Sequence, residues 1–264
     1  MSILDHVLGV LYKLHPSDTS FSKRGDLIAS TSSDQRYLYK DGKEGAESWM
    51  LSEWHELSSL PSSAQPLLAE YIAKMHLAAP PSGQKFGFPI PTCCGVTQQD
   101  NTEEASWSDF FSKRRIGDLL QRIGDSELSK LGKAVQDRVI PALLDHLDIK
   151  PSILHGDLWS GNARYSDNRD APITFDPSSY YGHSEADLGI THMFGGFSPA
   201  FYKRYHELVP KTEPVEEYEQ RQQLYELYHH LNHTLMFGGS YKSGAMKLMQ
   251  GLLQWADDRG DRNS

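Results

Sequence analysis

The sequence predicts an α+β protein that is mainly helical, with a short segment of mixed helix and strand at its start. Hydrophobic side chains recur at helical spacing in several stretches after residue 62, whereas strand-like runs are few and short. The chain has 264 residues, which is enough to bury a full core in one large or two small domains.

The first part of the chain predicts one helix followed by short strands. Residues 3–14 carry leucines on one helical stripe and end before a His-Pro pair; these leucines are Leu4, Leu8, Leu11 and Leu14. Residues 16–48 are polar, with strand candidates only at Leu27–Ala29 and Arg36–Tyr39. Trp49–Trp54 predicts a further strand that leads into a polar loop.

The next segments predict helices with recognisable ends. Ser62-Ser63 is expected to cap a helix that Pro80-Pro81 stops, with Gln65 completing a capping box with Ser62. Residues 80–106 read as a loop. Two more helices are expected at Trp107–Ile123, with Ser108 as N-cap, and from Ser126 to about Leu147, where Pro141 should kink or divide the helix.

Two short strand-like runs, Ser152–Leu154 and Ile173–Phe175, lie on either side of a tight loop and predict a small strand pair at the centre of the helical part. The remainder is helical by pattern, beginning with a cap-plus-proline start at Ser198-Pro199. Two hydrophobic stripes mark the last helices: Leu224, Leu227, Leu231 and Leu235 form one, and Met246, Met249 and Leu253 the other.

Charge and composition predict a soluble protein that does not bind nucleic acid or membranes. The formal net charge is −9, from 26 basic and 35 acidic side chains, which disfavours binding to nucleic acid or anionic lipid. The tight basic cluster at 113–115 reads as a solvated helix face. No apolar run approaches the ~18–20 residues of a membrane span, and residues 1–15 lack a basic region or cleavage site typical of a signal peptide.

The two cysteines, Cys93 and Cys94, are adjacent, and neighbouring cysteines rarely reach disulfide geometry. A reducing compartment, the cytoplasm, is therefore expected. Two thiols without a second pair or matched histidines make a poor zinc site, so they are predicted to be buried structural thiols.

The stretch that indicates chemistry is HGDLWSGN, His155 to Asn162, followed by Asp176 in ITFDP. Phosphoryl transfer needs an acceptor hydroxyl oriented by a carboxylate, and Mg²⁺ held against the phosphates by oxygen ligands. A base Asp and an Asn five residues later match the catalytic loop of kinases, and an Asp at the end of the next strand can supply the second metal ligand.

This arrangement assigns a role to each side chain. Asp157 is predicted to accept the proton of the attacking hydroxyl, while Asn162 and Asp176 are predicted to bind Mg²⁺ on ATP. His155 is expected to fix the loop backbone. Gly156 and Gly161 are expected to permit conformations that larger residues resist.

The chain resembles the fructosamine/ketosamine-3-kinases, which include protein-ribulosamine 3-kinases and are related to the aminoglycoside and choline kinases. The resemblance covers about two-thirds of the chain, from about residue 50 to its end. It rests on ILHGDLWSGN (153–162), ITFDPSSYYGHSEADLG (173–189), MFGGFSPAFYKRYHELVP (193–210), KFGFPIPTCCG (85–95), SWSDFFSKRRI (106–116) and LYELYHHLNH (224–233).

The resemblance implies a protein-kinase-like fold. Residues 1–56 would be the remnant of an N-terminal lobe with the inter-lobe connection, and 57–264 a mostly helical C-terminal lobe. It implies ATP-dependent phosphorylation of the sugar 3-hydroxyl of a ketosamine, such as a glycated lysine, whose product then breaks down, so that the reaction serves deglycation. It also implies that Trp159 lies by the acceptor and that Asp187 braces the catalytic loop.

His183 and Glu185 with Asp187 superficially resemble a metal cluster, but residues two apart on a helix do not share a face. Tyr180 and Tyr181 are expected to pack. A small-molecule kinase of the aminoglycoside or choline type is a further alternative, and the FGGF and YYGH runs favour the ketosamine kinases.

The sequence departs from the family before residue 50, where no run like G-x-G-x-x-G occurs. Lys40 with Glu53 as partner is a candidate phosphate lysine, but they lie too close in sequence for the helix and strand that belong between them. Lys40 is therefore predicted to be a loop charge, and the helix 3–14 a remnant of the αC helix. Three hypotheses follow: a mis-assigned start with an upstream exon missing, a pseudokinase or binding module that keeps the fold, or a weak or specialised kinase.

Overall fold

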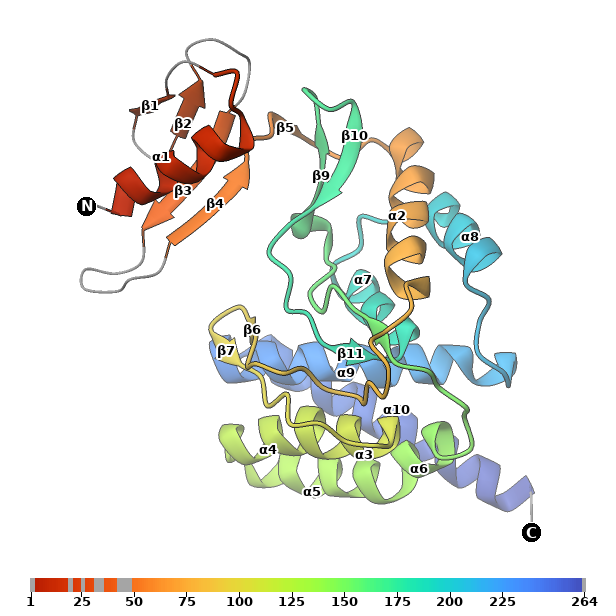
Figure 1. Cartoon of the computed structure of the whole chain (residues 1–264). Coiled ribbons are helices and arrows are strands. Elements are labelled where there is room, and N and C mark those ends of the chain that lie inside the picture. The colour runs from red at the N-terminus through yellow and green to blue at the C-terminus, as the bar shows by residue number, and fades with distance from the viewer. Residues whose placement is uncertain (1–2, 19–20, 25–26, 31–35, 42–48, 263–264) are drawn as a thin grey trace. The chain divides into compact units, whose positions relative to one another are not determined.

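The protein, described by a computed structural model, divides into two compact units (Figure 1). The structure describes residues 3–18, 21–24, 27–30, 36–41 and 49–262. The first unit comprises Met1–Ser58 with Ser166–Asp170, and the second Ser59–Tyr165 with Ala171–Ser264. The prediction of a mainly helical α+β protein is confirmed.

In its described residues, the first unit contains one helix and an antiparallel sheet with the order β1-β2-β3-β4. The elements are α1 (Ile3–Leu14), β1 (Phe21–Arg24), β2 (Leu27–Ser30), β3 (Arg36–Asp41) and β4 (Trp49–Glu53), followed by the short β5 (Leu57–Ser58). Val7 and Leu11 of the helix pack on Ile28 and Tyr37 of the sheet. The predicted stripe is wrong at its end, since Leu14 is 62% exposed in the last helical turn.

The three predicted strands of this unit are confirmed, and β1 was missed because its sequence, FSKR, has no clear apolar alternation. Lys40 was predicted to lie in a loop, and this is wrong. Its backbone belongs to β3, where it pairs with Met50 of β4. The carboxylate of Glu53 binds the guanidinium of Arg169.

The second unit holds the remaining helices and strands. Its helices are α2 (Gln65–Leu77), α3 (Trp107–Phe110), α4 (Asp118–Ile123), α5 (Ser126–Ala134), α6 (Ile140–Leu144), α7 (Gly189–Phe194), α8 (Pro199–Leu208), α9 (Tyr218–Phe237) and α10 (Ser240–Arg262). Its strands are β6 (Cys93–Cys94), β7 (Thr97–Gln98), β8 (Ser152–Ile153), β9 (Ala163–Ser166), β10 (Ala171–Thr174) and β11 (Tyr181–Gly182), with Ser166 itself in the first unit. π-Helical stretches join α3 to α4 and α5 to α6. Among the described residues, the helices are all too short or too polar to cross a bilayer.

The helix predictions hold better for the interior of the helices than for their ends. The capping box is wrong because Gln65 uses its side chain elsewhere: its amide nitrogen donates to the Gly196 carbonyl, and its amide oxygen accepts from the Ser198 backbone amide. The N-cap of α3 is Ser106, whose hydroxyl accepts from the Asp109 amide, and not Ser108. Pro141 lies in the first turn of α6, directly after a π-helical stretch, so it divides the helix as predicted.

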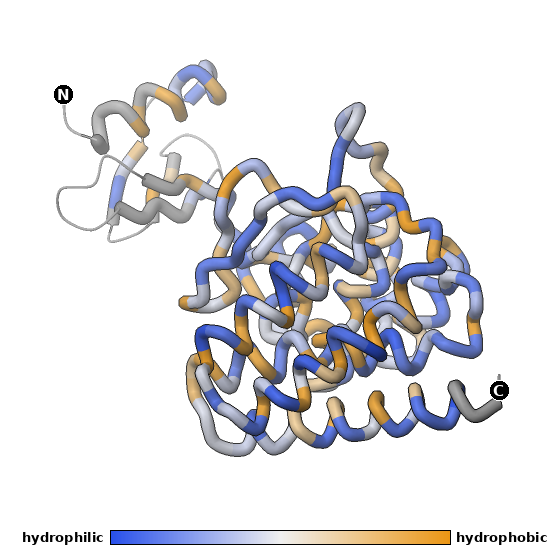
Figure 2. The backbone as a smooth tube through the Cα atoms, turned by 90° about the horizontal axis from the view of Figure 1, so that it is seen from below, coloured by the Kyte–Doolittle hydropathy of each residue, from blue (hydrophilic) through white to orange (hydrophobic). Residues whose placement is uncertain are grey.

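Two hydrophobic clusters stabilise the second unit. The larger one joins α3–α6 to the long helices α9 and α10 (Figure 1), with Leu224, Leu227 and Leu231 fully buried. Hydrophobic and hydrophilic residues alternate along the helix that ends at the C-terminus (Figure 2). The smaller cluster joins α2 to α8 and includes Leu158, which anchors the segment after β8 in the core.

The strands β8 and β10 do not pair with each other, so the predicted central strand pair is wrong. β8 pairs with β11, placing Ile153 opposite Tyr181, and β10 is the neighbour of β9. The unpredicted strand β9 explains the difference, because it begins directly after Asn162, and the chain turns back after Ser166 to place β10 beside it.

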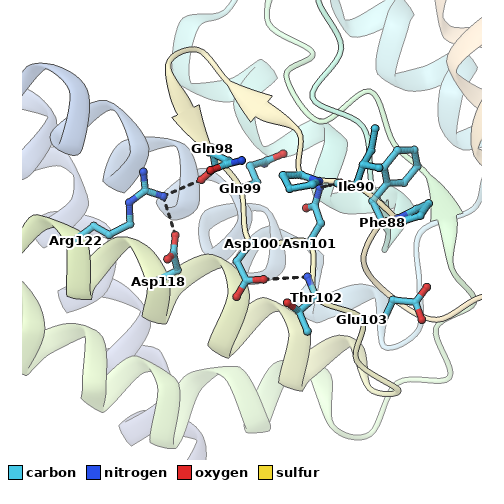
Figure 3. Close-up of a pocket in the computed structure, with 12 residues that line it drawn as sticks. Phe88, Ile90, Gln98, Gln99, Asp100, Asn101, Thr102, Glu103, Asp118 and Arg122 are labelled. Atoms are coloured by element: carbon cyan, nitrogen blue, oxygen red, sulfur yellow. Dashed lines mark hydrogen bonds and ion pairs between the residues drawn. The ribbon is translucent and has the colours of Figure 1, made fainter.

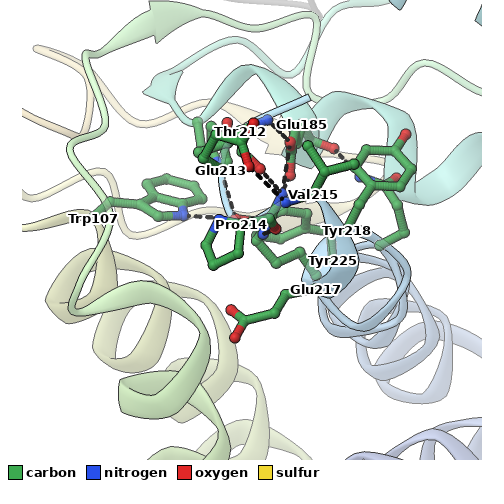
Figure 4. Close-up of polar contacts among 12 residues, drawn as sticks. Trp107, Glu185, Thr212, Glu213, Pro214, Val215, Glu217, Tyr218 and Tyr225 are labelled. Atoms are coloured by element: carbon green, nitrogen blue, oxygen red, sulfur yellow. Dashed lines mark hydrogen bonds and ion pairs between the residues drawn. The ribbon is translucent and has the colours of Figure 1, made fainter. Parts of the chain in front are cut away.

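A buried polar network lies between the 3₁₀ turn that precedes α7 and the start of α9 (Figure 4). Glu185 accepts from Nε of Arg221 at 2.7 Å and from the Thr212 amide at 2.7 Å. The His183 ring binds the hydroxyls of Tyr225 and Thr212. Both side chains therefore serve the fold, in agreement with the rejection of a metal cluster in this motif.

The basic cluster at 113–115 is not a uniformly solvated face, and that prediction is wrong for Arg115. Its guanidinium lies 4.5 Å from the ring centre of Phe110 and 4.0 Å from that of Tyr180, and it donates to Oδ1 of Asn101 at 2.8 Å. The side chain is 1% exposed. Lys113 keeps the predicted solvated position and pairs with Asp109. The packing of Tyr180 is also as predicted.

Candidate active site

The loop from His155 to Asn162 is joined by hydrogen bonds to the segment after β10. Nε2 of His155 binds the Phe175 carbonyl at 3.1 Å, and the Ser178 amide donates to the His155 carbonyl at 2.7 Å. The Phe175 amide donates to the Asn162 carbonyl at 3.2 Å. These bonds place Asp176, the residue after Phe175, beside the loop, and they confirm that His155 fixes the loop backbone.

Asp187 supports the same loop through both of its carboxylate oxygens. One of its carboxylate oxygens accepts from the Gly156 amide at 2.7 Å, and the other accepts from the His155 amide at 2.8 Å. Nε2 of His76 lies 3.0 Å from this second oxygen. Burial alone would raise the pKa of Asp187, but the hydrogen bonds and charge of the histidines and the loop amide keep it below its ordinary value. The expected bracing role of Asp187 is confirmed.

Two glycines shape the loop for different reasons. Gly156 has a φ of +82°, and a Cβ there would lie 2.3 Å from the Ser178 carbonyl oxygen, so the prediction that it permits an unusual backbone is confirmed. Gly161 does not have a positive φ, so an unusual backbone conformation is not the reason for a glycine at this position. A Cβ there would instead lie 2.1 Å from the indole of Trp159, so this glycine makes room for that ring.

Asp157 and Asn162 are in direct contact. Nδ2 of Asn162 donates to the Asp157 carbonyl at 2.9 Å and to its carboxylate Oδ2 at 3.1 Å. Burial is the largest cause that raises the pKa of Asp157, to about 6; the negative charges of Asp187 and Asp176 add to this rise, and the bond from Asn162 opposes it. The carboxylate is therefore held close to the ionisation range of a useful general base.

Two hard oxygen ligands are available beside Asp157. The side-chain amide nitrogen of Asn162 donates to Asp157, which leaves the side-chain oxygen Oδ1 of Asn162 for a cation. Asp176 is exposed and has a φ of 53°, a left-handed conformation that Asp adopts more readily than most residues. Among the residues that the structure describes, neither Asp157 nor Asp176 forms an ion pair. This donor set fits the oxygen preference of Mg²⁺.

A cavity of about 440 Å³ opens next to Asp157. Trp159 and Phe194 lie on its wall with ring centres 5.5 Å apart, and the wall continues through His233 to Tyr241. Trp159 is 37% exposed, so its ring is available to a bound molecule. The cavity has the size and the apolar, aromatic lining of a small-molecule site.

Sequence reasoning missed the contribution of α9 and of the β6–β7 turn to this cavity. Asn232 and His233 line it from α9, and Cys94 lines it from β6. Asn232 and His233, which follow Leu231 of the leucine stripe, were the available signal for a site. A helix that only packs in the core would carry apolar side chains on its buried face. Both cysteines are free; Cys94 is buried as predicted, whereas Cys93 is exposed.

A larger cavity of about 880 Å³ lies elsewhere, between the loop before α3 and helix α4 (Figure 3). Most of its charged side chains already have partners: Asp118 pairs with Arg122 at 3.1 Å, and Asp100 pairs with Arg114 at 2.9 Å. None of the predicted site residues lines it. The smaller cavity is therefore the better candidate for the active site, because Asp157 and Trp159 line it.

Comparison with known proteins identifies the family. A family model described as fructosamine kinase matches residues 28–255. Ketosamine-3-kinase from Mus musculus is 43% identical over 172 residues, which cover 64% of this chain and 54% of that protein. Chloroplastic protein-ribulosamine 3-kinase from Arabidopsis thaliana is 39% identical over 194 residues, covering 72% and 57%. The chain thus spans just over half the length of these curated relatives.

Solved structures show the same fold. A structure described as a fructosamine-3-kinase from Thermobifida fusca matches with a TM-score of 0.76 at 23% identity, covering 94% of this chain and 98% of that one. Choline kinase LicA from Streptococcus pneumoniae matches with a TM-score of 0.55 at 13% identity, covering 94% and 99%, and LicA has also been solved in complex with AMP. The predicted protein-kinase-like fold is confirmed, and the chain belongs to the fructosamine kinase family.

Proposed function

We propose that this chain carries the catalytic residues of an ATP-dependent phosphotransferase that acts on the sugar 3-hydroxyl of ketosamines. The observation that carries the proposal is the contact of Asn162 with Asp157, with Asp176 placed beside them by the bonds of Phe175. The names of the mouse and Arabidopsis relatives supply the substrate class, ketosamines and ribulosamines, which include sugar adducts on protein lysines.

Each residue has a role in this reaction. Asp157 accepts the proton of the acceptor hydroxyl while that oxygen bonds to phosphorus and the bond to the leaving ADP breaks. The side-chain oxygen Oδ1 of Asn162 and the carboxylate of Asp176 would hold Mg²⁺, which neutralises charge on the phosphates when bound. Asp187 and His155 keep the loop in position.

Trp159 is proposed to bind the acceptor. Its ring borders the cavity that also contains Asp157, and an aromatic face attracts the positively charged amine of a ketosamine. Phosphorylation of the sugar would then lead to loss of the adduct, so the function is deglycation. The two free thiols fit a reducing compartment such as the cytoplasm.

The test is ADP release by the full chain with Mg-ATP and either a fructosamine or a ribulosamine. Asp157→Asn should lower turnover by at least ~100-fold, because general-base catalysis contributes ~10²–10⁴-fold. Asp145→Asn, an exposed carboxylate after α6, is the matched control and should leave turnover unchanged. Equal turnover of the Asp157→Asn variant and the wild-type chain would refute the proposed mechanism.

The alternative is a pseudokinase or binding module that keeps the fold. Mg-ATP should raise the unfolding temperature if nucleotide binds, and EDTA should reverse the rise. A nucleotide-dependent shift without any ADP release would favour the binding module over the enzyme.

A further inference from the structure

Three metal-ligating side chains from distant parts of the chain meet at the catalytic carboxylate. Cys94 comes from β6, Asp157 from the loop after β8, and His229 from the middle of α9. Their candidate ligand atoms, one sulfur, one carboxylate oxygen and one ring nitrogen, all lie within 4.8 Å of one another. Cys94 and Asp157 also line the cavity of about 440 Å³, which gives an ion a route from solvent.

The histidine is free to bind. His229 is 3% exposed, and its Nδ1 has no hydrogen-bond partner among the described residues. Burial lowers the pKa of His229 to about 3, so the ring is neutral, which is the form that coordinates a metal. A buried polar atom without a partner is costly, and a cation bound at Nδ1 would satisfy it.

The other two ligands are also available. Burial raises the pKa of Cys94 to about 12, so the thiol is protonated and a metal would have to displace the proton. Asp157 uses Oδ2 for the bond from Asn162, which leaves capacity on its other oxygen. A thiolate, an imidazole and a carboxylate together prefer a softer cation than Mg²⁺.

We propose that Cys94, Asp157 and His229 form a binding site for Zn²⁺ at the active site. Zinc takes sulfur at ~2.3 Å and nitrogen or oxygen at ~2.0–2.2 Å, which puts tetrahedral ligand atoms roughly 3.3–3.6 Å apart, so the side chains close by ~1 Å on binding. Cys94 and Asp157 border the cavity, so a small molecule or water from it can take the fourth position. This site differs from the proposed magnesium site at Asn162 and Asp176 in both residues and ligand chemistry.

Zinc at this site inhibits phosphoryl transfer, because a carboxylate bound to Zn²⁺ cannot accept the proton of the acceptor hydroxyl. This consequence rests on the proposed function, whereas zinc binding itself does not. The pair of adjacent cysteines had been judged a poor zinc site from the sequence. The structure replaces that pair with one cysteine and two ligands that are remote in sequence.

The experiment measures binding of Zn²⁺ to the metal-free full chain by calorimetry, with Mg²⁺ as comparison, and records the absorption spectrum with Co²⁺ as a probe. Cys94→Ser and His229→Asn should weaken Zn²⁺ binding by at least ~10-fold. Cys93→Ser changes the exposed neighbouring thiol and is the matched control, with unchanged affinity. The thiolate-to-cobalt charge-transfer band should be absent from Cys94→Ser and present in Cys93→Ser.

Equal zinc affinity in Cys94→Ser and the wild-type chain, or loss of binding in Cys93→Ser, would overturn the site. Should Cys94→Ser fail to fold in EDTA, the wild-type cobalt spectrum decides, since absence of a thiolate band rules the site out. Zinc binding that leaves ADP release unaffected would refute the inhibition and keep the site. Lack of ADP release under any condition would count against the proposed function alone, because the binding and cobalt measurements need no turnover.

Discussion

Substitution of Gly156 by alanine is the sharpest test of how the loop from His155 to Asn162 is held. The new Cβ would lie 2.3 Å from the Ser178 carbonyl oxygen, whereas an ordinary contact starts at 3.4 Å, so one of the two segments must move by about 1 Å. Ser178 cannot yield easily, because its amide donates to His155 at 2.7 Å and its hydroxyl donates to the Cys93 carbonyl at 2.6 Å.

The expected cost has two parts. A positive φ costs an alanine ~1–2 kcal/mol, and overpacking a filled site costs ~1–3 kcal/mol. Together they lower the free energy of unfolding by roughly 2–5 kcal/mol. Gly124 at the end of α4 is the matched control, since its φ is +67° and a Cβ there meets no atom within 4 Å. Gly124→Ala should show the backbone part only.

The assay is urea unfolding of both variants, followed by circular dichroism. The extra loss in Gly156→Ala relative to Gly124→Ala should be ~1–3 kcal/mol, which corresponds to a difference in unfolding temperature of roughly 2–12 °C. Equal destabilisation of the two variants would show that the loop accommodates a Cβ, and would refute the close approach of Gly156 and Ser178 as the reason for the glycine.

Three further predictions concern buried polar groups. Asp187→Asn should lower the free energy of unfolding by at least ~1–3 kcal/mol, because an amide cannot accept from all three donors that the carboxylate serves; urea unfolding measures it. Arg115→Lys should cost at least ~2 kcal/mol, since a lysine cannot make the planar stacked contacts, while Lys113→Ala stays within ~0.5 kcal/mol. Burial lowers the pKa of His183 from 6.5 to about 4, so the unfolded state takes up the proton at a higher pH than the folded state does. The free energy of unfolding should therefore be highest above pH 6.5 and fall by about 3 kcal/mol as the pH drops to about 4. Urea unfolding at each pH measures this fall.

Each of these has an outcome that contradicts it. An unchanged urea midpoint for Asp187→Asn would mean that the loop amides find other acceptors. Similar losses in Arg115→Lys and Lys113→Ala would mean that the stacked guanidinium contributes no more than a surface charge. For His183, replacement by glutamine should flatten the pH dependence of stability, and an equally steep profile in the variant would exclude this residue as its source.

The part of the site that the sequence could predict is local. Asp157 and Asn162 lie five positions apart on one loop, so a single motif brings them together, and Asp176 follows shortly after the end of β10. The remaining contributors are set by tertiary packing. His229 and Cys94 are remote in sequence and meet Asp157 only because α9 passes beside the β6–β7 turn. Asp187 was found only through the family resemblance.

For the fold, periodicity located the helices well and their ends poorly. The leucines of α9 form the buried stripe that their spacing predicts. The capping box at Ser62 failed because Gln65 is bound by the residues before α8, a partner that local sequence does not reveal. The burial of Arg115 likewise depends on Tyr180, which follows it much later in the chain.

The two loop amides held by Asp187 have a consequence for hydrogen exchange. The NH groups of His155 and Gly156 donate to the carboxylate of Asp187. This residue is 2% exposed, and its neighbours in the chain, Ala186 and Leu188, belong to the larger and the smaller hydrophobic cluster. Deuterium can therefore reach them only when that part of the second unit opens, and not through motion of the loop itself. Their exchange rates should therefore match those of amides in α9, because both would exchange only when the second unit opens.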